Sequence, residues 1–289
     1  MKFIIAAATA LLLQLAGLAQ GEYRKTTKGM YYRIIPTGTG PRITSSHVVR
    51  FHIEQKVNDS VIFSSFGKGL SVIALNKTGK DDEQAGILKQ MRSGDSLVTL
   101  NLANDLMANK DLVLPDFIHA GDSLFQCIKI IDIFPSEAAY ANFKKQGDAR
   151  KIAGDQKLIA NYLKANKITA VKTPLGCYMQ LLKKGTGAKP IKGSTVSIRY
   201  TGKTLGGVFF DSNEQPGEEK PLLEFVTGKS MMIPGFEEAA MLLQKGGRCR
   251  IFIPSVHAYG EGGSGDLIGP NEILVFDVEL VKVTMPKKK

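Results

Sequence analysis

The chain has 289 residues, of which 43% are apolar and 22% are charged, and this composition excludes a wholly disordered protein. At about 150 residues per domain, the length predicts roughly two domains. Three cysteines are too few for a disulfide framework, while a formal charge of +11 at pH 7 raises the question of a nucleic-acid partner.

The first 19 residues have the pattern of a secretory signal peptide. Lys2 supplies a positive charge, an apolar run follows over residues 3–13, and the small residues Gly17 and Ala19 precede a cleavage point after Ala19. The alternative is a membrane anchor, but the run falls short of the roughly 18–20 residues that span a bilayer. We therefore expect the protein to be exported, either periplasmic or secreted, with no stable membrane span.

An internal repeat organises the rest of the chain. Residues 29–65 match residues 176–212 at a constant offset of 147, and later segments also pair between the two halves with small gaps. A repeat this long indicates two copies of one domain, because solenoid units run about 20–50 residues. The predicted organisation is a signal peptide over 1–19, a first domain over 20–135, a helical linker over 136–173, a second domain over 174–285 and a basic tail over 286–289.

Within each copy, alternating apolar and polar residues predict β-strands, as in residues 195–200, 248–253 and 273–281. One short helix is predicted over residues 233–243, because Pro234 stands in its first turn and a glycine pair follows its end. The predicted fold class is therefore α+β, with two domains that are each an antiparallel β-sheet wrapped around a short α-helix.

The linker over residues 136–173 is predicted to be helical, with a break or kink at Gly147-Asp148. It carries eight basic and three acidic residues, a pattern more typical of a solvated helix face than of a nucleic-acid surface, so we expect no nucleic-acid partner. An apolar stripe favours a connector packed on one domain, and the alternative is a homodimer formed through this helix. The stripe consists of Ala149, Ile152, Ile159, Tyr162 and Leu163.

The second copy carries five short segments whose order and spacing resemble the FKBP-type peptidyl-prolyl cis-trans isomerases, from residue 185 to residue 283. The resemblance implies two FKBP-like domains and an enzyme that accelerates rotation about X–Pro bonds in folding exported proteins. It further implies proline-containing polypeptides as substrates, no cofactor and no metal, and binding of macrolide inhibitors such as FK506. The matching segments are residues 196–202, 209–212, 228–237, 254–260 and 273–280.

The chemistry of prolyl isomerisation explains why such a site is expected to be apolar. The rotational barrier of about 18–20 kcal/mol comes from amide resonance, so no nucleophile or metal is required. A pocket that binds the twisted imide better than either planar form is sufficient. Apolar walls with one or two donors for the substrate backbone would form such a pocket.

The resemblance also implies roles for individual residues. Phe236 would form the floor under the proline ring, where many relatives have Trp. The Tyr259 hydroxyl and the Ile233 N–H would bind substrate carbonyls, and Asp211 would orient Tyr200 or polarise the imide. The implied catalytic residues are Tyr200, Phe210, Asp211, Ile233, Phe236, Tyr259 and Phe276, and the implied substrate-binding residues are Leu223, Met232, Ala258, Leu267 and Ile268.

Two of these residues depart from the family pattern. Phe236 lacks the area and the N–H of an indole, and Leu223 stands where relatives often carry an aromatic, so we expect altered substrate preference. The alternative for the aromatic residues is simple core packing, which is their ordinary role. Three of the implied site residues argue against it, because they need polar partners when they are buried. They are Tyr200, Asp211 and Tyr259.

The first copy is predicted to be a catalytically silent FKBP-like domain. At the repeat offset, Ile53 replaces Tyr200, Ser64 replaces Asp211, and Gln126 falls near the position of Phe276. This copy would bind unfolded chains or only position the second one. The alternative function for the whole chain is a non-catalytic peptide-binding chaperone.

Other motifs give weaker signals. Residues 260–265 match G-x-G-x-x-G, but no helix follows, so they are better interpreted as a mobile loop over the pocket than as a nucleotide site. The four histidines lack metal-ligand spacing. Cys127, Cys177 and Cys249 are expected to be buried free thiols, with a Cys177–Cys249 bridge as the alternative.

Overall fold

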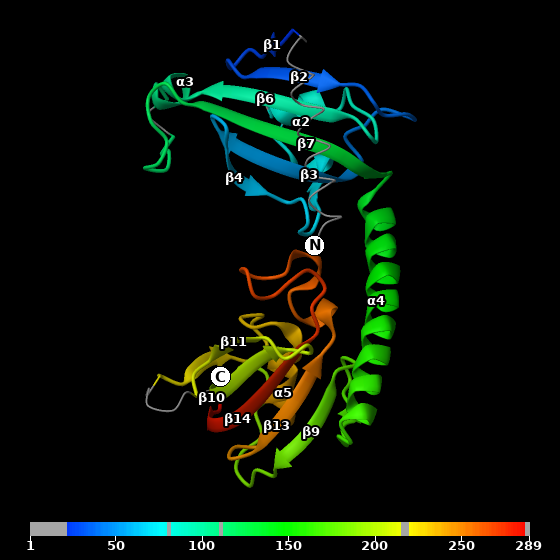
Figure 1. Cartoon of the computed structure of the whole chain (residues 1–289), viewed down its shortest axis with the longest axis vertical. Coiled ribbons are helices and arrows are strands. Elements are labelled where there is room, and N and C mark those ends of the chain that lie inside the picture. Colours follow the sequence, from blue (N-terminus) through cyan, green and yellow to red (C-terminus); the bar gives the residue numbers. More distant parts are fainter. Residues whose placement is uncertain (1–21, 80–81, 110–111, 215–219, 287–289) are drawn as a thin grey trace. The chain divides into compact units, whose positions relative to one another are not determined.

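The chain forms two compact units, Met1–Lys144 (unit 1) and Lys145–Lys289 (unit 2). Each unit contains one seven-stranded sheet with antiparallel strand pairs and at least one short helix (Figure 1). The predicted α+β fold class is therefore confirmed. This computed structural model describes residues 22–79, 82–109, 112–214 and 220–286, so the predicted signal peptide and residues 287–289 of the basic tail lie outside the described residues.

The sheet of unit 1 has the order β1-β2-β6-β7-β3-β4, with β5 paired to β3. Its largest buried side chains include Leu88 at the end of the short helix α2, Met91 just after this helix, and Leu97 and Ile130 of the sheet. The strands are β1 (Arg24–Lys25), β2 (Tyr31–Ile35), β3 (Val48–Val57), β4 (Ser60–Ser64), β5 (Ser71–Ala74), β6 (Ser96–Leu102) and β7 (Ser123–Phe134), and the helices are η1 (Leu75–Lys77), α2 (Glu83–Leu88) and α3 (Ala103–Met107).

The sheet of unit 2 repeats this arrangement as β11-β10-β14-β13-β9-β8, with β12 paired to β10. The helix α5 begins with Pro234 at its first turn, within the predicted range, and buries Phe236, Ala239 and Ala240 against the sheet. The strands are β8 (Val171–Lys172), β9 (Tyr178–Lys183), β10 (Thr195–Thr204), β11 (Phe209–Ser212), β12 (Leu223–Val226), β13 (Arg248–Ile253) and β14 (Leu274–Thr284), and the helices are α5 (Pro234–Leu242), η2 (Ser255–His257) and η3 (Gly260–Gly262).

The long strands β3 and β10 carry the same irregularities in strand pairing. The register shifts after Arg50 and after Gln55 in β3, and after Ser197 and after Gly202 in β10. Each pair of positions is separated by the repeat offset of 147 residues. Because bulges bend a strand and re-aim its side chains, the two sheets share local geometry as well as strand order.

A single helix, α4 (Glu137–Ala165), occupies most of the predicted linker. The break predicted at Gly147-Asp148 is wrong: the helix is continuous through both residues. One glycine inside a helix costs only about 1 kcal/mol relative to alanine, which the helix-forming residues around it offset. None of the helices in the described parts of the chain is both long and apolar enough to cross a membrane.

The apolar stripe of α4 packs within unit 2. Ile159 and Leu163 are buried in a cluster with Phe252, Ile273 and Val275 from β13, β14 and the loop before β14. The ring of Tyr162 lies 5.8 Å from that of Phe252, centroid to centroid. These members of the stripe therefore contact the sheet of their own chain.

Candidate active site

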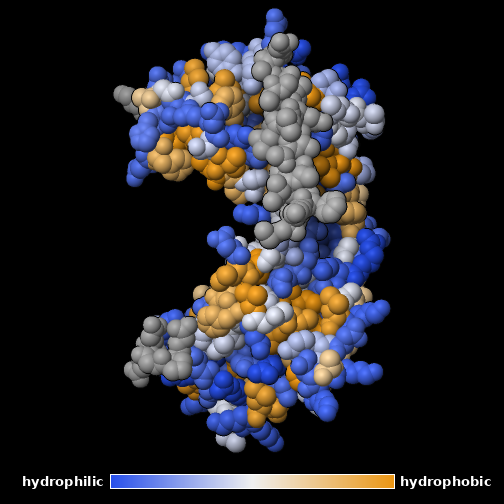
Figure 2. All heavy atoms as spheres, in the orientation of Figure 1, coloured by the Kyte–Doolittle hydropathy of each residue, from blue (hydrophilic) through white to orange (hydrophobic). Residues whose placement is uncertain are grey.

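A cavity of about 570 Å³ lies in unit 2 between β10, β11, the start of α5 and the loop before β14. Hydrophobic surface gathers on unit 2 in the region of β11 and this loop (Figure 2). Eleven of the twelve predicted site residues line the cavity. They are Tyr200, Phe210, Asp211, Leu223, Met232, Ile233, Phe236, Tyr259, Leu267, Ile268 and Phe276.

Four aromatic rings form the inner wall of this cavity. The ring of Phe276 is centred 5.0 Å from Phe236 and 5.5 Å from Phe210, at interplanar angles of 71° and 78°. The rings of Tyr200 and Phe236 are 5.5 Å apart at 82°. Edge-to-face pairs of this kind are favourable beyond their buried area. Since Phe236 and Phe276 are only 3% and 5% exposed, the wall is formed before any ligand enters.

Gly202 makes this ring arrangement possible, although it was not among the predicted site residues. It lies in β10 directly opposite Phe276 in β14. A Cβ at this position would lie 2.6 Å from the Phe210 ring and 2.7 Å from the Phe276 ring. Any other residue would therefore force the two rings apart. The sequence signal was present, because a glycine inside a strand often marks a close approach.

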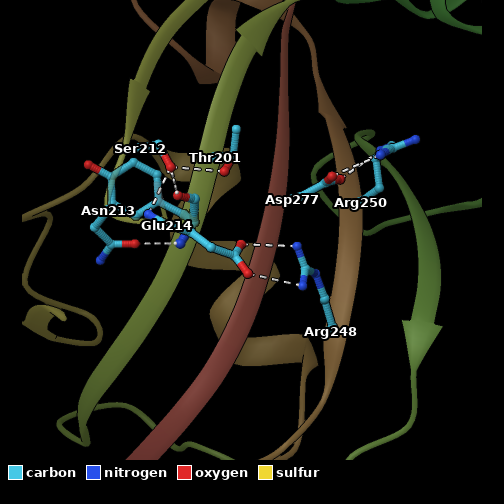
Figure 3. Close-up of polar contacts among 8 residues, drawn as sticks. Thr201, Ser212, Asn213, Glu214, Arg248, Arg250 and Asp277 are labelled. Atoms are coloured by element: carbon cyan, nitrogen blue, oxygen red, sulfur yellow. Dashed lines mark hydrogen bonds and ion pairs between the residues drawn. The ribbon is translucent and has the colours of Figure 1, made fainter. Parts of the chain in front are cut away.

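A hydrogen-bond network fixes Tyr200 and Asp211 at the rim. The Tyr200 hydroxyl donates to Asp211 Oδ2 at 2.5 Å, and the Tyr200 N–H donates to Asn213 Oδ1 at 2.8 Å. The Ser212 hydroxyl donates to the Tyr200 carbonyl at 2.9 Å and lies 3.0 Å from the Thr201 hydroxyl (Figure 3). Ser212 and Asn213 are buried, so these bonds hold the end of β11 to β10.

The surroundings of the Tyr200 hydroxyl, which include the Asp211 carboxylate, make it a hydrogen-bond donor. Burial, followed by the hydrogen bond to Asp211 and the negative charge of Asp211, holds the pKa of the Tyr200 hydroxyl well above its ordinary value. Tyr200 therefore keeps its proton at neutral pH. Its hydroxyl can orient the Asp211 carboxylate but cannot serve as a base.

Ion pairs continue the network beyond the rim. Arg248 in β13 makes two hydrogen bonds to Glu214, which follows Asn213, and Arg250 makes two to Asp277 (Figure 3). Each arginine fork meets a carboxylate from a neighbouring segment, a planar geometry that orients both partners. These pairs are partly exposed, so they contribute orientation more than stability.

Two hydrogen-bond donors at the cavity have no acceptor among the described residues. One is the Ile233 N–H, in the residue before Pro234, and the other is the Tyr259 hydroxyl. Tyr259 is 41% exposed, so its ring lies partly in solvent at the rim. Both donors are free to bind a carbonyl of a bound peptide.

The outer wall is a short, hydrogen-bonded loop. Ser264 and Ile268 exchange two backbone hydrogen bonds of 2.9 and 3.2 Å. Gly263 lies at φ 63°, where a Cβ would be 2.4 Å from the Ile268 carbonyl oxygen, so a glycine is needed there. Leu267 is 56% exposed and so presents an apolar side chain at the cavity mouth.

Members of one protein family are similar to this chain. A family model described as FKBP-type peptidyl-prolyl cis-trans isomerase matches residues 187–281. The chain is 32% identical over 168 residues to the macrophage infectivity potentiator of Trypanosoma cruzi, covering 58% of this chain and 81% of that protein. The chain belongs to the FKBP-type peptidyl-prolyl cis-trans isomerase family.

Two bacterial relatives each match about half of the chain. It is 40% identical to the outer membrane protein MIP of Legionella longbeachae, over 50% of this chain and 58% of that protein. It is 38% identical to a probable FKBP-type isomerase, FkpA, of Neisseria meningitidis, over 52% of each protein. The chain thus spans little more than half the length of these first relatives.

The FKBP-type pocket contains residues that the sequence analysis did not assign. Met231, Ser264, Gly265 and Asp266 also line it, whereas the predicted Ala258 does not and packs against the core beside it. Ser264 and Gly265 belong to the glycine-rich loop that was expected over the pocket. Met231 has no periodic or motif signal that would mark it, because it lies in the irregular segment between β12 and α5 with 54% of its surface exposed.

None of the three cysteines lines the pocket. Within the described ranges, no three His, Cys, Asp or Glu side chains are placed to hold a metal ion. All three cysteines are free, so the alternative Cys177–Cys249 bridge is not formed. Burial raises the pKa of Cys177 and Cys249 to about 12 and that of Cys127 to about 11, which keeps all three as unreactive thiols.

The equivalent positions of unit 1 are filled differently. Gln126 lies opposite Gln55 in the β3–β7 register, as Phe276 lies opposite Gly202 in unit 2. The pairing of residues 88–94 with residues 240–246 places Gln84 of α2 at the position of Phe236. The Gln84 amide donates to Gln126, whereas Phe236 and Phe276 meet edge to face in the FKBP-type site. Three glutamines thus occupy the space of two aromatic rings and a glycine.

Proposed function

We propose that unit 2 is a peptidyl-prolyl cis-trans isomerase that accelerates rotation about X–Pro bonds in exported polypeptides. The observation that carries this proposal is the aromatic cavity, which is preformed, apolar and supplied with two unpaired donors. Rotation breaks no covalent bond, so differential binding of the twisted imide is the whole chemical task.

In this mechanism the proline ring enters the cavity against Phe236, with Phe276, Phe210 and Tyr200 around it. Removing the imide from water favours the twisted state, which has less charge separation than the planar forms. The Ile233 N–H and the Tyr259 hydroxyl bind the flanking carbonyls and fix the peptide on both sides of the bond. Catalysis then requires no proton transfer to the substrate.

Asp211 would act at the rim, beside the imide. Its Oδ2 accepts from the Tyr200 hydroxyl, whose proton is retained, and Asp211 itself is exposed at the rim. We propose that the carboxylate orients Tyr200 and stabilises the polarised imide carbon as resonance is lost. Ala258 would contribute by holding the backbone next to Tyr259, because it packs on the core.

The composition of the wall sets the substrate preference. Phe236 leaves more space than Trp, and Leu223 and Met232 present flexible aliphatic surface beside it. We propose that the pocket accepts proline with a range of apolar preceding residues and that it binds macrolides such as FK506 less tightly than relatives with Trp. A hydrophobic pocket discriminates such differences by only about 10- to 200-fold.

The wider assignments are proposed on the sequence pattern. The chain would be exported, with domains over 20–135 and 174–285 joined by the linker over 136–173, and unit 1 would be catalytically silent. The exposed side chains of β4 in unit 1, which are 45–51% exposed, favour contact with unfolded chains. They are Val61, Ile62 and Phe63.

A homodimer through α4 remains as a second proposal about assembly. Leu158 of α4 is 54% exposed, which leaves an apolar side chain on the helix surface. Light scattering on the full chain across a concentration series would measure its mass. A constant monomer mass would exclude the dimer.

The function is tested by cis-to-trans isomerisation of an Ala-Leu-Pro-Phe-type peptide in the presence of the full chain. We expect acceleration that is reduced by Tyr259→Phe and by Asp211→Asn. Ser64→Ala, at the equivalent position in unit 1, is the matched control and should change nothing. If the folded chain gives no acceleration, the isomerase proposal is wrong and the peptide-binding chaperone is favoured instead.

A further inference from the structure

A buried carboxylate in α4 makes contacts that the pocket itself does not explain. Asp155 is 0% exposed. Its Oδ2 accepts from the Ser255 N–H at 2.8 Å and from the Ser255 hydroxyl at 2.6 Å, and its Oδ1 accepts from Lys151 Nζ at 2.9 Å. Burying a charge is unfavourable unless it is paired and hydrogen-bonded, and here three donors satisfy it.

Ser255 stands at the start of the segment that presents Tyr259 to the cavity. It is also fully buried and opens the turn η2 at the end of β13. The turn is closed by hydrogen bonds from His257 N–H to the Pro254 carbonyl, 2.9 Å, and from Ala258 N–H to the Ser255 carbonyl, 3.0 Å. Because the turn is internally bonded, the position of Ser255 sets the direction in which Tyr259 leaves it.

The far side of the Tyr259 segment is also held. The Asn271 N–H donates to the Gly260 carbonyl at 2.7 Å, which ties the residue after Tyr259 to the loop before β14. Tyr259 therefore lies between two fixed points, Ser255 and Gly260. The position of Ser255 depends on the Asp155 side chain of α4.

The helix reaches this segment because it packs on the face of the sheet opposite the cavity. In β13, Ile251 and Ile253 point into the core beneath α5, whereas Phe252 between them contacts α4. In β14, Phe276 faces the cavity and Val275 faces α4. The central strands β13 and β14 thus have the isomerase pocket on one face and α4 on the other.

We propose that Asp155 is a positioning residue for the isomerase, acting through Ser255 on the Tyr259 hydroxyl. The inference rests on the proposed function of unit 2, and it makes the second half of α4 part of the isomerase unit. Loss of the carboxylate would leave two buried Ser255 donors unsatisfied, so the turn would shift toward water. Tyr259 would then no longer be held in the geometry that binds the substrate carbonyl.

The experiment compares Asp155→Ala, Asp155→Asn and Ile159→Ala in the full chain, each alone and combined with Tyr259→Phe. Ile159→Ala is the matched control, since Ile159 is buried one turn further along α4 in the apolar cluster with Phe252 and offers no hydrogen-bond acceptor in its side chain. The kcat/KM for the prolyl peptide is measured at a temperature at which circular dichroism shows every variant folded. Backbone amide hydrogen exchange over residues 255–260 is measured in parallel.

The proposal expects Asp155→Ala to lower kcat/KM roughly tenfold, as small misplacements of binding groups do. Asp155→Asn keeps a side-chain oxygen that can accept from Ser255 and should recover part of the loss. In the Tyr259→Phe background, the further loss from Asp155→Ala should be small, because the hydroxyl it positions is absent. Ile159→Ala should lower the melting temperature without changing kcat/KM.

Additive losses from Asp155→Ala and Tyr259→Phe, or equal losses from Asp155→Ala and Ile159→Ala, would overturn the proposal. Hydrogen exchange separates this outcome from failure of the proposed function. Exchange over residues 255–260 should be faster in Asp155→Ala than in Ile159→Ala whether or not the chain is an active isomerase. Unchanged exchange there would overturn the positioning role directly.

Discussion

Units 1 and 2 have the same sheet order and the same two register shifts in β3 and β10, but the aromatic cavity described above lies in unit 2. The difference lies at a few positions on one face of the sheet. Gly202, Phe236 and Phe276 form the wall in unit 2, and glutamines stand at all three equivalent positions in unit 1. The fold depends on alternation along strands, whereas the pocket depends on particular side chains.

Two of the glutamines of unit 1 form a hydrogen-bonded pair. The Gln84 amide bonds to Gln126, so neither side chain is left without a partner. Phe63 of unit 1 is 45% exposed, whereas its counterpart Phe210 packs against Phe276. Without an opposing ring, the aromatic side chain turns toward solvent. Exchanging residues between the units tests whether these positions account for the difference.

The largest effect is expected from Gly202→Gln, which places the residue of unit 1 into unit 2. The new side chain would occupy the space of the Phe210 and Phe276 rings and close the cavity. The kcat/KM for the prolyl peptide should fall by about 100-fold or more, because the binding wall is displaced by an ångström or more. The control is Gln55→Gly in unit 1, which should leave kcat/KM unchanged, and equal values for both variants would break the comparison.

Phe276→Gln is expected to have a smaller effect than Gly202→Gln, and its effect is on the stability of unit 2. It removes ring contacts with Phe236 and Phe210 and puts a polar group on an apolar wall that offers it no partner. The free energy of unfolding of unit 2 should decrease by about 3–5 kcal/mol, as for other large-to-small changes at buried aromatics. Urea unfolding followed by circular dichroism measures it, and Gln126→Ala in unit 1 should leave the transition of unit 2 in place.

Tyr259→Phe and Asp211→Asn should each reduce kcat/KM by roughly tenfold without unfolding the chain, the effect of one lost hydrogen bond or charge in the transition state. Both side chains lie at the exposed rim, so stability should change little. Melting temperatures within a few degrees of the wild type would support this assignment. A loss of activity that simply followed a loss of fold would contradict it.

The smallest effect concerns alkaline pH. The pKa of Tyr200 is raised in the folded chain by burial and by Asp211, so its protonated form stabilises the fold below about pH 10, the unfolded value. This contribution should be lost as pH rises from there through the folded pKa. Melting temperature measured against pH should therefore decline less above pH 10 in Tyr200→Phe than in the wild type. Identical declines would show that Tyr200 does not contribute.

The sequence predicted the fold and most of the site because both depend on short-range patterns. The alternation in residues 195–200 specified β10, and the segments around Tyr200, Phe236 and Tyr259 kept recognisable order and spacing. The continuity of α4 was missed because one glycine is a weak breaker when packing supports the helix. The link from Asp155 to Ser255 spans 100 residues, and no local pattern reports such a contact.

The central claim is that the FKBP-type cavity of unit 2 is the isomerase site and that unit 1 is silent. Exchange NMR on an Ala-Leu-Pro-Phe-type peptide, with a substoichiometric amount of the labelled full chain, observes turnover and binding together. The account predicts cis-trans exchange peaks for the peptide, with shift changes at Tyr200, Phe210 and Phe276. Exchange peaks that coincide with shift changes at Ile53 and Gln126 instead, or no exchange peaks at all, would contradict it.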